Sequence, residues 1–327
     1  MAVLYIKEQG AFIQKQDDRI IVTKNNNRLI DIPVFKIDNI AIIGNVQIST
    51  QALHLLMMNS VDISFLSFSG KYLGNVASDA SKNIFLRFEQ YQYYLDVSRR
   101  LTIARTIVDN KIDNQISVIK NHRWEGITYN WHKDIESLVK YKKKIADTKT
   151  GNELLGIEGI CSNVYFGAFG KMFKCDFEFT GRNRRPPKDP INVILSLAYT
   201  FLTKEVCSAL DAESFESYLG FLHGIRYGRK SLALDLVEEF RQPVVDRLVI
   251  ILFNKKMISA YDFETEDGRV TLNEDGFRKF CNEYERWMTG KNTLSGEKSY
   301  RAIIRKQIDL LKRSITQEEE YVPYKWK

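Results

Sequence analysis

The chain has few cysteines and no long apolar run, and each scarcity excludes a class of protein. Its four cysteines among 327 residues form no Cys-x-x-Cys pair, so neither a disulfide framework nor a cysteine zinc site is predicted. No apolar run approaches ~18 residues and no secretory leader precedes the first predicted strand, so we expect no transmembrane helix and no membrane partner. This composition fits reduced thiols in a prokaryotic cytoplasm.

Basic residues outnumber acidic ones, and the excess is unevenly distributed. The chain carries 48 Lys and Arg against 41 Asp and Glu, a net charge of +7. Residues 1–85 hold 8 basic and 7 acidic residues, which leaves 48 − 8 = 40 against 41 − 7 = 34, a net of +6, for the remainder. A positive excess favours polyanionic partners through counterion release, although it does not specify which polyanion and simple solubility is the alternative.

Short strand patterns dominate the first 80 residues, and helical spacing dominates the rest. One helix is expected at 48–59 with Thr50 as its N-cap, and strands are expected at 3–6, 11–15, 19–23, 28–32, 37–43, 63–66 and 72–76. We therefore predict an α+β protein. Residues 1–80 form a small β-sandwich-like domain for dimerisation, and residues 81–327 form a larger all-α domain that carries the catalytic groups.

Glu158 lies within an apolar helical stripe. Leu155, Cys161, Tyr165 and Phe169 recur at helical spacing on its side of the predicted helix. An unpaired ionised carboxylate in such a stripe costs several kcal/mol, so Glu158 must shift its pKa, meet a cation or bind a metal. The alternative is a carboxylate that reaches the solvated rim of a loosely packed helix.

His223 precedes a second acidic helix. Asp235 and Glu238 are three residues apart and share one helix face, while Leu232, Leu236 and Phe240 form the apolar stripe of the same helix. Carboxylates with a neutral imidazole are ligands for a hard or borderline divalent ion. A solvated helix face is the alternative for the two carboxylates. Glu158, His223 and Glu238 would supply three ligands if the segments meet, which spacing alone does not establish.

Two clusters of basic residues suit a phosphate-bearing substrate. A Pro-rich loop runs into a predicted helix at Asp189, the expected N-cap, and Pro190, its first residue. A second cluster lies in the loop between His223 and the acidic helix. An exposed connection with incidental charge is the alternative. The candidate DNA-binding residues are Arg182, Arg184, Arg185 and Lys188 in the first cluster, and Arg226, Arg229 and Lys230 in the second.

These motifs together resemble a known family. GIEG surrounds Glu158, YLGFLH ends at His223, SLALDLVEEFR ends at Arg241, and DPINVILSLAYTFLT spans 189–203. In this order and spacing the motifs resemble the CRISPR-associated (Cas) endonuclease of the spacer-adaptation step, the first-numbered Cas protein. The resemblance covers essentially the whole chain.

The resemblance implies specific roles. Glu158, His223 and Glu238 would be the metal ligands, Asp235 an additional acidic group of the same site, and Arg241 a basic group beside it. It also implies Mg²⁺ or Mn²⁺ as cofactor, double-stranded DNA as substrate, a homodimer built through the N-terminal domain, and the small second-numbered Cas protein as partner.

The leading hypothesis is metal-assisted phosphoryl transfer on DNA, in which an external 3′-hydroxyl attacks a phosphodiester and inserts spacer DNA into a repeat array. Two alternatives remain. A branched-DNA repair nuclease would cut strands without joining them. A non-catalytic nucleic-acid-binding scaffold would keep its cellular function after Glu158 is replaced by Ala.

Overall fold

Short apolar segments near the N-terminus build two four-stranded sheets. One has the order β1-β5-β7-β8, with β1, β5 and β7 parallel and β8 antiparallel to β7. The other has the order β4-β3-β2-β6. The strands are β1 Ala2–Ile6, β2 Phe12–Gln16, β3 Arg19–Lys24, β4 Asn27–Pro33, β5 Ile37–Ile43, β6 Gln47–Ile48, β7 Asp62–Leu66 and β8 Tyr72–Val76. Every predicted strand is present, and the short β6 was missed.

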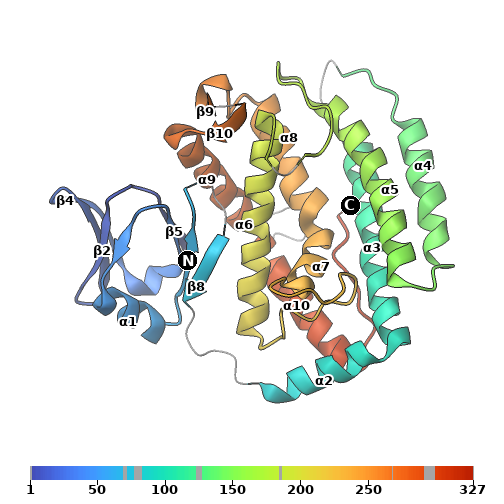
Figure 1. Cartoon of the computed structure of the whole chain (residues 1–327), viewed down its shortest axis with the longest axis horizontal. Helices are drawn as coiled ribbons and strands as arrows, with labels where there is room; N and C mark the ends of the chain where they lie inside the picture. Colours follow the sequence, from blue (N-terminus) through green and yellow to red (C-terminus); the bar gives the residue numbers. More distant parts are fainter. Residues whose placement is uncertain are drawn as a thin grey trace. The chain divides into compact units, whose positions relative to one another are not determined.

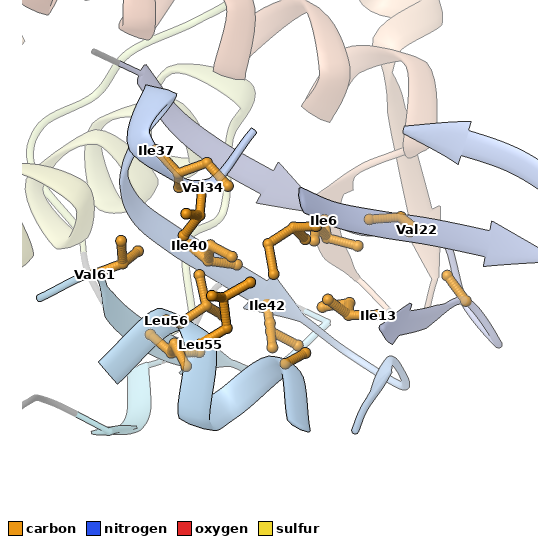
Figure 2. Close-up of a cluster of buried hydrophobic side chains, with 14 residues drawn as sticks. Ile6, Ile13, Val22, Val34, Ile37, Ile40, Ile42, Leu55, Leu56 and Val61 are labelled. Atoms are coloured by element: carbon orange, nitrogen blue, oxygen red, sulfur yellow. The ribbon is translucent and has the colours of Figure 1, made fainter. Parts of the chain in front are cut away.

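Helix α1, Thr50–Met58, completes this unit. Its N-cap is Ser49, whose hydroxyl accepts from the Ala52 N–H at 3.2 Å, so the prediction of Thr50 was wrong by one residue. The core joins both sheets and α1 through aliphatic side chains such as Ile13 of β2, Ile42 of β5 and Leu56 of α1 (Figure 2). The predicted sandwich-like packing with one helix is therefore confirmed.

The computed structural model describes residues 2–68, 72–76, 83–122, 127–183, 186–266, 268–290 and 299–326. It divides into two compact units, Met1–Lys82 and Asn83–Lys327 (Figure 1). The helices of the second unit are α2 Ile84–Leu95, α3 Val97–Lys120, α4 His132–Lys142, α5 Gly151–Phe169, α6 Pro190–Ala212, α7 Ser231–Phe240, α8 Arg247–Asn254, α9 Glu274–Thr289 and α10 Tyr300–Thr316.

The second unit is mostly but not entirely helical. Strands β9 (Phe263–Glu266) and β10 (Arg269–Leu272) pair antiparallel, so the prediction of an all-α domain was wrong at this hairpin. The long pattern over 85–118 is two helices, because Asp96 ends α2 and its carboxylate accepts from the Ser98 and Arg99 N–H groups at the start of α3.

Helix α6 begins as predicted, with Asp189 as N-cap and Pro190 in its first turn. By length and composition it is apolar enough to cross a membrane, which the sequence analysis did not anticipate, although half of its most apolar stretch is buried inside this unit. Ile194, Ala198 and Leu202 are fully buried, as in the core helix of a packed bundle.

Helix α7 is buried almost all round. Apart from Leu234, each residue of Ser231–Phe240 is buried, including its acidic side chains. It continues into a π-helical turn, Arg241–Asp246, and then into α8. Pro243 has no N–H to donate, which disfavours a regular α-helical turn there. Both α3 and α6 pack against α7 and this turn, and α3 also packs against α5.

Candidate active site

Three helices bring two acids to one lysine. The Lys111 Nζ of α3 lies 2.6 Å from Glu238 Oε2 of α7 and also contacts Glu158 Oε1 of α5. The side chains of Lys111 and Glu238 are 3% and 5% exposed, and Glu158 is more accessible. The segments carrying Glu158 and Glu238 therefore do meet, and their carboxylates converge on one cation.

Glu238 is held as a carboxylate despite its burial. Burial alone would raise its pKa, but the positive charges of Arg241 and Lys111 outweigh that effect and lower the pKa of Glu238 to about 2. Arg241 Nε lies 3.2 Å from Glu238 Oε1, so the two cations contact different oxygens of the same carboxylate. The alternative of a solvated helix face is excluded for both Glu238 and Asp235, which are buried.

Asp235 fixes the position of His223. Its Oδ1 accepts from the His223 N–H at 2.9 Å and contacts His223 Nδ1 at 2.7 Å. Its Oδ2 accepts from the Phe221 and Leu222 N–H groups at 2.5 and 2.9 Å. Both oxygens are thus occupied and fully buried, so the geometry makes Asp235 a positioning residue. With Nδ1 engaged, Nε2 is the His223 nitrogen left for a ligand.

Gly220 permits this close packing. A Cβ atom at Gly220 would lie 2.7 Å from the Ser231 carbonyl carbon and 2.8 Å from Asp235 Oδ2. The segment that carries His223 can therefore approach the start of α7 only when residue 220 has no side chain.

Tyr199 supports Arg241 from α6. The Arg241 guanidinium lies 4.6 Å from the Tyr199 ring centroid, and the Tyr199 hydroxyl donates to Asp246 Oδ1. Burial raises the pKa of Asp246 to about 6, even though Tyr199, Tyr165 and Arg241 oppose that rise. Tyr199 and Asp246 thus hold the Arg241 guanidinium in place, in addition to its contact with Glu238.

The segment after α10, which includes Tyr321 and Tyr324, contacts α7 at Glu239. The Tyr321 hydroxyl donates to Glu239 Oε1 and the Tyr324 N–H donates to Glu239 Oε2 at 3.0 Å. The Asn114 amide of α3 donates to the carbonyl oxygens of Glu239 and Tyr324 at 2.9 and 3.1 Å. Burial raises the pKa of Glu239 to about 7. The last residues therefore help to hold α7 against α3.

Most of the predicted DNA-binding residues that the structure describes have partners within the protein. Arg182 donates to Asn192 Oδ1 at 2.7 Å and to Ser196 Oγ at 3.0 Å, Arg229 donates to the Gly224 carbonyl, and Lys230 lies 2.9 Å from Asp211 Oδ2. Arg184 and Arg185 lie outside the described residues. Lys188 and Arg226 are exposed. Arg182 and Arg229 therefore organise the two basic loops.

The two carboxylates are ligands of the kind that a divalent cation takes, and the positive charge between them in this structure is a lysine. Glu158 and Glu238 face a common point that Lys111 Nζ occupies as a stand-in cation. Within the described residues, no three His, Cys, Asp or Glu side chains are grouped closely enough to hold a metal. His223 interacts with Glu238 electrostatically but does not complete a cluster with the two acids.

Several site residues were missed by the sequence analysis. Lys111 follows Ile107 and Val108 by one helical turn in a largely buried stretch of α3, which is the signal that identified Glu158: a charge within an apolar stripe. Ser162, one turn after Glu158, donates to Glu158 Oε1 at 2.8 Å. No sequence pattern pointed to Asp246, because the π-helical turn sets the position of its side chain.

Comparison with known proteins gives consistent matches. The family model described as CRISPR associated protein Cas1 matches residues 4–286. The "CRISPR-associated endonuclease Cas1 3" of Thermus thermophilus is 32% identical over 330 residues, which cover 99% of this chain and 97% of that protein.

Solved structures share the fold over nearly the whole chain. A Cas1 protein from Thermotoga maritima has a TM-score of 0.87 at 26% identity and covers 99% of this chain and 100% of its own. A casposase bound to integration product has a TM-score of 0.86 at 24% identity, and the match covers 99% of this chain and 93% of the casposase chain. A chain of a Cas6-RT-Cas1–Cas2 complex has a TM-score of 0.85 at 24% identity, and the match covers 99% of this chain and 36% of that one. At 24% identity the last two show the fold alone.

Proposed function

Because the chain belongs to the Cas1 family of CRISPR-associated proteins, we propose that it is a metal-dependent DNA integrase and endonuclease that inserts spacer DNA into a CRISPR repeat array. A 3′-hydroxyl of the incoming DNA attacks a phosphodiester of the repeat, so that one P–O bond forms as another breaks. Water in place of the hydroxyl gives hydrolysis, the endonuclease activity.

One observation carries the proposal: Glu158 and Glu238, from separate helices, direct their carboxylates at a single positive charge. We assign Glu158, Glu238 and His223 Nε2 as the groups that hold Mg²⁺ or Mn²⁺. When bound, such an ion polarises a phosphate oxygen and favours deprotonation of the attacking hydroxyl. The low pKa of Glu238 keeps that ligand ionised throughout the physiological range.

The surrounding residues prepare the site for a phosphodiester. Asp235 orients His223 through its Nδ1, and Tyr199 and Glu238 hold Arg241 in place. The Arg241 guanidinium therefore adds fixed positive charge next to the carboxylates, where charge develops on the transferred phosphate. A Cβ at Gly156 or Gly159 would meet no atom within 4 Å, so the helix on either side of Glu158 leaves room for a bulky substrate.

The proposed partners follow from the family and its solved structures. Double-stranded DNA is the substrate, and exposed Arg226 and Lys188 are the first candidates for contacts to its backbone. A second copy of the chain, joined through the N-terminal unit, and the small Cas2 protein complete the proposed assembly; a Cas1–Cas2 complex is among the solved structures that share this fold. The four cysteines are free thiols, which agrees with a cytoplasmic location.

Strand transfer tests this function. The purified protein is incubated with Mn²⁺, a short duplex with free 3′-hydroxyl ends and a repeat-bearing plasmid, with and without the small partner. Joined products that depend on Glu158 support the integrase. Cut strands without joined products would indicate the repair nuclease. Binding of DNA without either product, and unchanged spacer acquisition by Glu158→Ala in cells, would indicate the scaffold.

A further inference from the structure

Lys111 is a buried cation at the point where the site acids converge. Its Nζ contacts Glu158 Oε1 and lies 2.6 Å from Glu238 Oε2, and its neighbours Ile107, Val108 and Ile112 on α3 are fully buried. A lysine in such surroundings is costly unless it is paired. The two carboxylates supply that pairing.

The same contacts are needed by the carboxylates. Two ionised carboxylates that reach one ammonium are close enough to repel each other strongly in a buried site. Arg241 compensates Glu238 through its other oxygen, and Ser162 Oγ gives Glu158 only a neutral donor. Lys111 is therefore the positive charge that Glu158 and Glu238 share.

We propose that Lys111 is a built-in counter-ion that holds the Glu158–Glu238 pair together in the metal-free protein and that a divalent cation must displace to bind. The inference rests on the proposed function, and it assigns to Lys111 control over how tightly the site binds metal. An ammonium and a divalent cation both require these carboxylate oxygens, so the two compete directly.

Lysine suits this role better than arginine would. Its ammonium is a compact charge on a flexible four-carbon stem, so it can withdraw by rotation of side-chain bonds, whereas a planar guanidinium binds a carboxylate through a rigid fork. The measured metal affinity is then that of an exchange, in which two charge-assisted contacts of Lys111 are lost as the ion binds. A site without Lys111 binds metal without that loss and without repulsion from the ammonium.

The test compares Mn²⁺ binding by wild type and Lys111→Met. Free Mn²⁺ is followed by electron paramagnetic resonance during titration of the full chain at one pH. We expect Lys111→Met to bind Mn²⁺ about tenfold to a hundredfold more tightly, because the hydrogen bond of Lys111 to Glu158 and its ion pair with Glu238 no longer have to be broken. In EDTA the variant melts at a lower temperature than wild type, and Mn²⁺ raises its melting temperature by more.

Lys142→Met is the matched control. Lys142 of α4 also pairs with two carboxylates, because its Nζ lies 2.5 Å from Asp113 Oδ1 and 3.2 Å from Asp109 Oδ2, both on α3. Neither Glu158 nor Glu238 takes part in these ion pairs. Removal of Lys142 leaves the Mn²⁺ affinity of the site unchanged. If Lys142→Met gained as much Mn²⁺ affinity as Lys111→Met, the gain would come from the lower net charge of the protein, and the inference would be overturned.

Other outcomes separate the inference from the function on which it rests. Equal or weaker Mn²⁺ binding by folded Lys111→Met, with binding lost in Glu158→Gln, overturns the counter-ion role and leaves the metal-dependent function intact. No Mn²⁺ binding by either protein overturns both. If Lys111→Met does not fold, ¹⁵N-lysine NMR of wild type decides: the Lys111 ammonium signal must shift on Mg²⁺ saturation, and an unchanged signal in the metal-bound protein contradicts displacement.

Discussion

The interiors of the two units differ in kind. The N-terminal core is aliphatic (Figure 2). Ser64 is the single polar residue among the described buried side chains of this unit. Around α7 in the helical unit, the buried positions include Lys111, Asp235, Glu238, Glu239 and Asp246. Buried aliphatic groups stabilise a fold directly, whereas buried charges stabilise it only when every charge has its partner.

Substitutions in the two interiors should therefore have different consequences. A substitution in the N-terminal core should alter the free energy of unfolding without altering the chemistry. A substitution in the charged interior should alter the chemistry even where the chain still folds. The following four substitutions are chosen to separate these two effects.

The largest expected effect is on catalysis, from Glu238→Gln. This change keeps the shape of the side chain but removes the charge that Lys111 and Arg241 both contact. We expect strand transfer to fall by about a thousandfold or more, since removing one stabilising group at a reacting phosphate or carbonyl already costs up to that factor. Product formation at saturating Mn²⁺ measures the effect. Glu264→Gln, at an exposed position of β9, is the control and should retain full activity.

The next effect is on stability, from Leu56→Ala in the N-terminal core. Leu56 is fully buried on α1, so its truncation should lower the free energy of unfolding by about 2–5 kcal/mol. Denaturant titration of this unit's transition measures it. Met58→Ala on the same helix is the control, because Met58 is 84% exposed and its loss should change stability by less than about 0.5 kcal/mol. A large loss of strand transfer per folded Leu56→Ala molecule would contradict the expectation that the N-terminal core affects stability and not the chemistry.

Asp246→Asn should change how stability depends on pH. Burial raises the pKa of Asp246 from its ordinary 3.8 to about 6, so the folded protein binds this proton more tightly than the unfolded chain does. The stabilisation from that proton is complete below about pH 4 and is lost as the pH rises through 6. Relative to wild type, Asp246→Asn should therefore gain at most about 3 kcal/mol of stability between pH 4 and 7. Denaturant titrations across this range measure it, and parallel pH profiles would contradict the buried-carboxyl account.

Gly220→Ala should misplace His223. The added methyl would meet the Ser231 carbonyl carbon and Asp235 Oδ2, so the segment must move away from α7. A shift of about 1 Å in a catalytic group costs on the order of a hundredfold in rate, which is the loss expected in strand transfer. Gly224→Ala is the matched control, because a Cβ there meets no atom within 4 Å. Equal activity of the two variants would refute the role of the close approach.

The N-terminal unit could be predicted from sequence almost completely. Its strands are short apolar segments separated by turn residues, so Ile13 and Ile42 were placed in strands by local rules alone. Ser49 was missed as the cap because Ser and Thr stand side by side and either can act as an N-cap. The family was also predicted correctly from the order and spacing of the motifs, and the α+β class from strand patterns followed by helical spacing.

The charged interior could be predicted only in part. Glu158 was found because it interrupts an apolar stripe, and the same argument would have found Lys111. The partner of each charge is set by tertiary packing, so the pairing of Asp235 with the His223 segment and of Glu239 with Tyr321 had no local signal. For the same reason the hydrogen bonds of Arg182 to Asn192 and of Arg229 to the Gly224 carbonyl could not be predicted from sequence, and the contacts of these two arginines to DNA stay a prediction.

The central claim is that Glu158 and Glu238 share one cation, which is Lys111 in the metal-free protein and a divalent ion in the active enzyme. Anomalous diffraction from crystals soaked in Mn²⁺ tests it most directly. We predict one manganese peak between the Glu158 and Glu238 carboxylates, within reach of His223 Nε2, with the Lys111 ammonium withdrawn from both acids. Lys111 still bridging the two carboxylates in Mn²⁺-saturated crystals, with no manganese between them, would contradict the account.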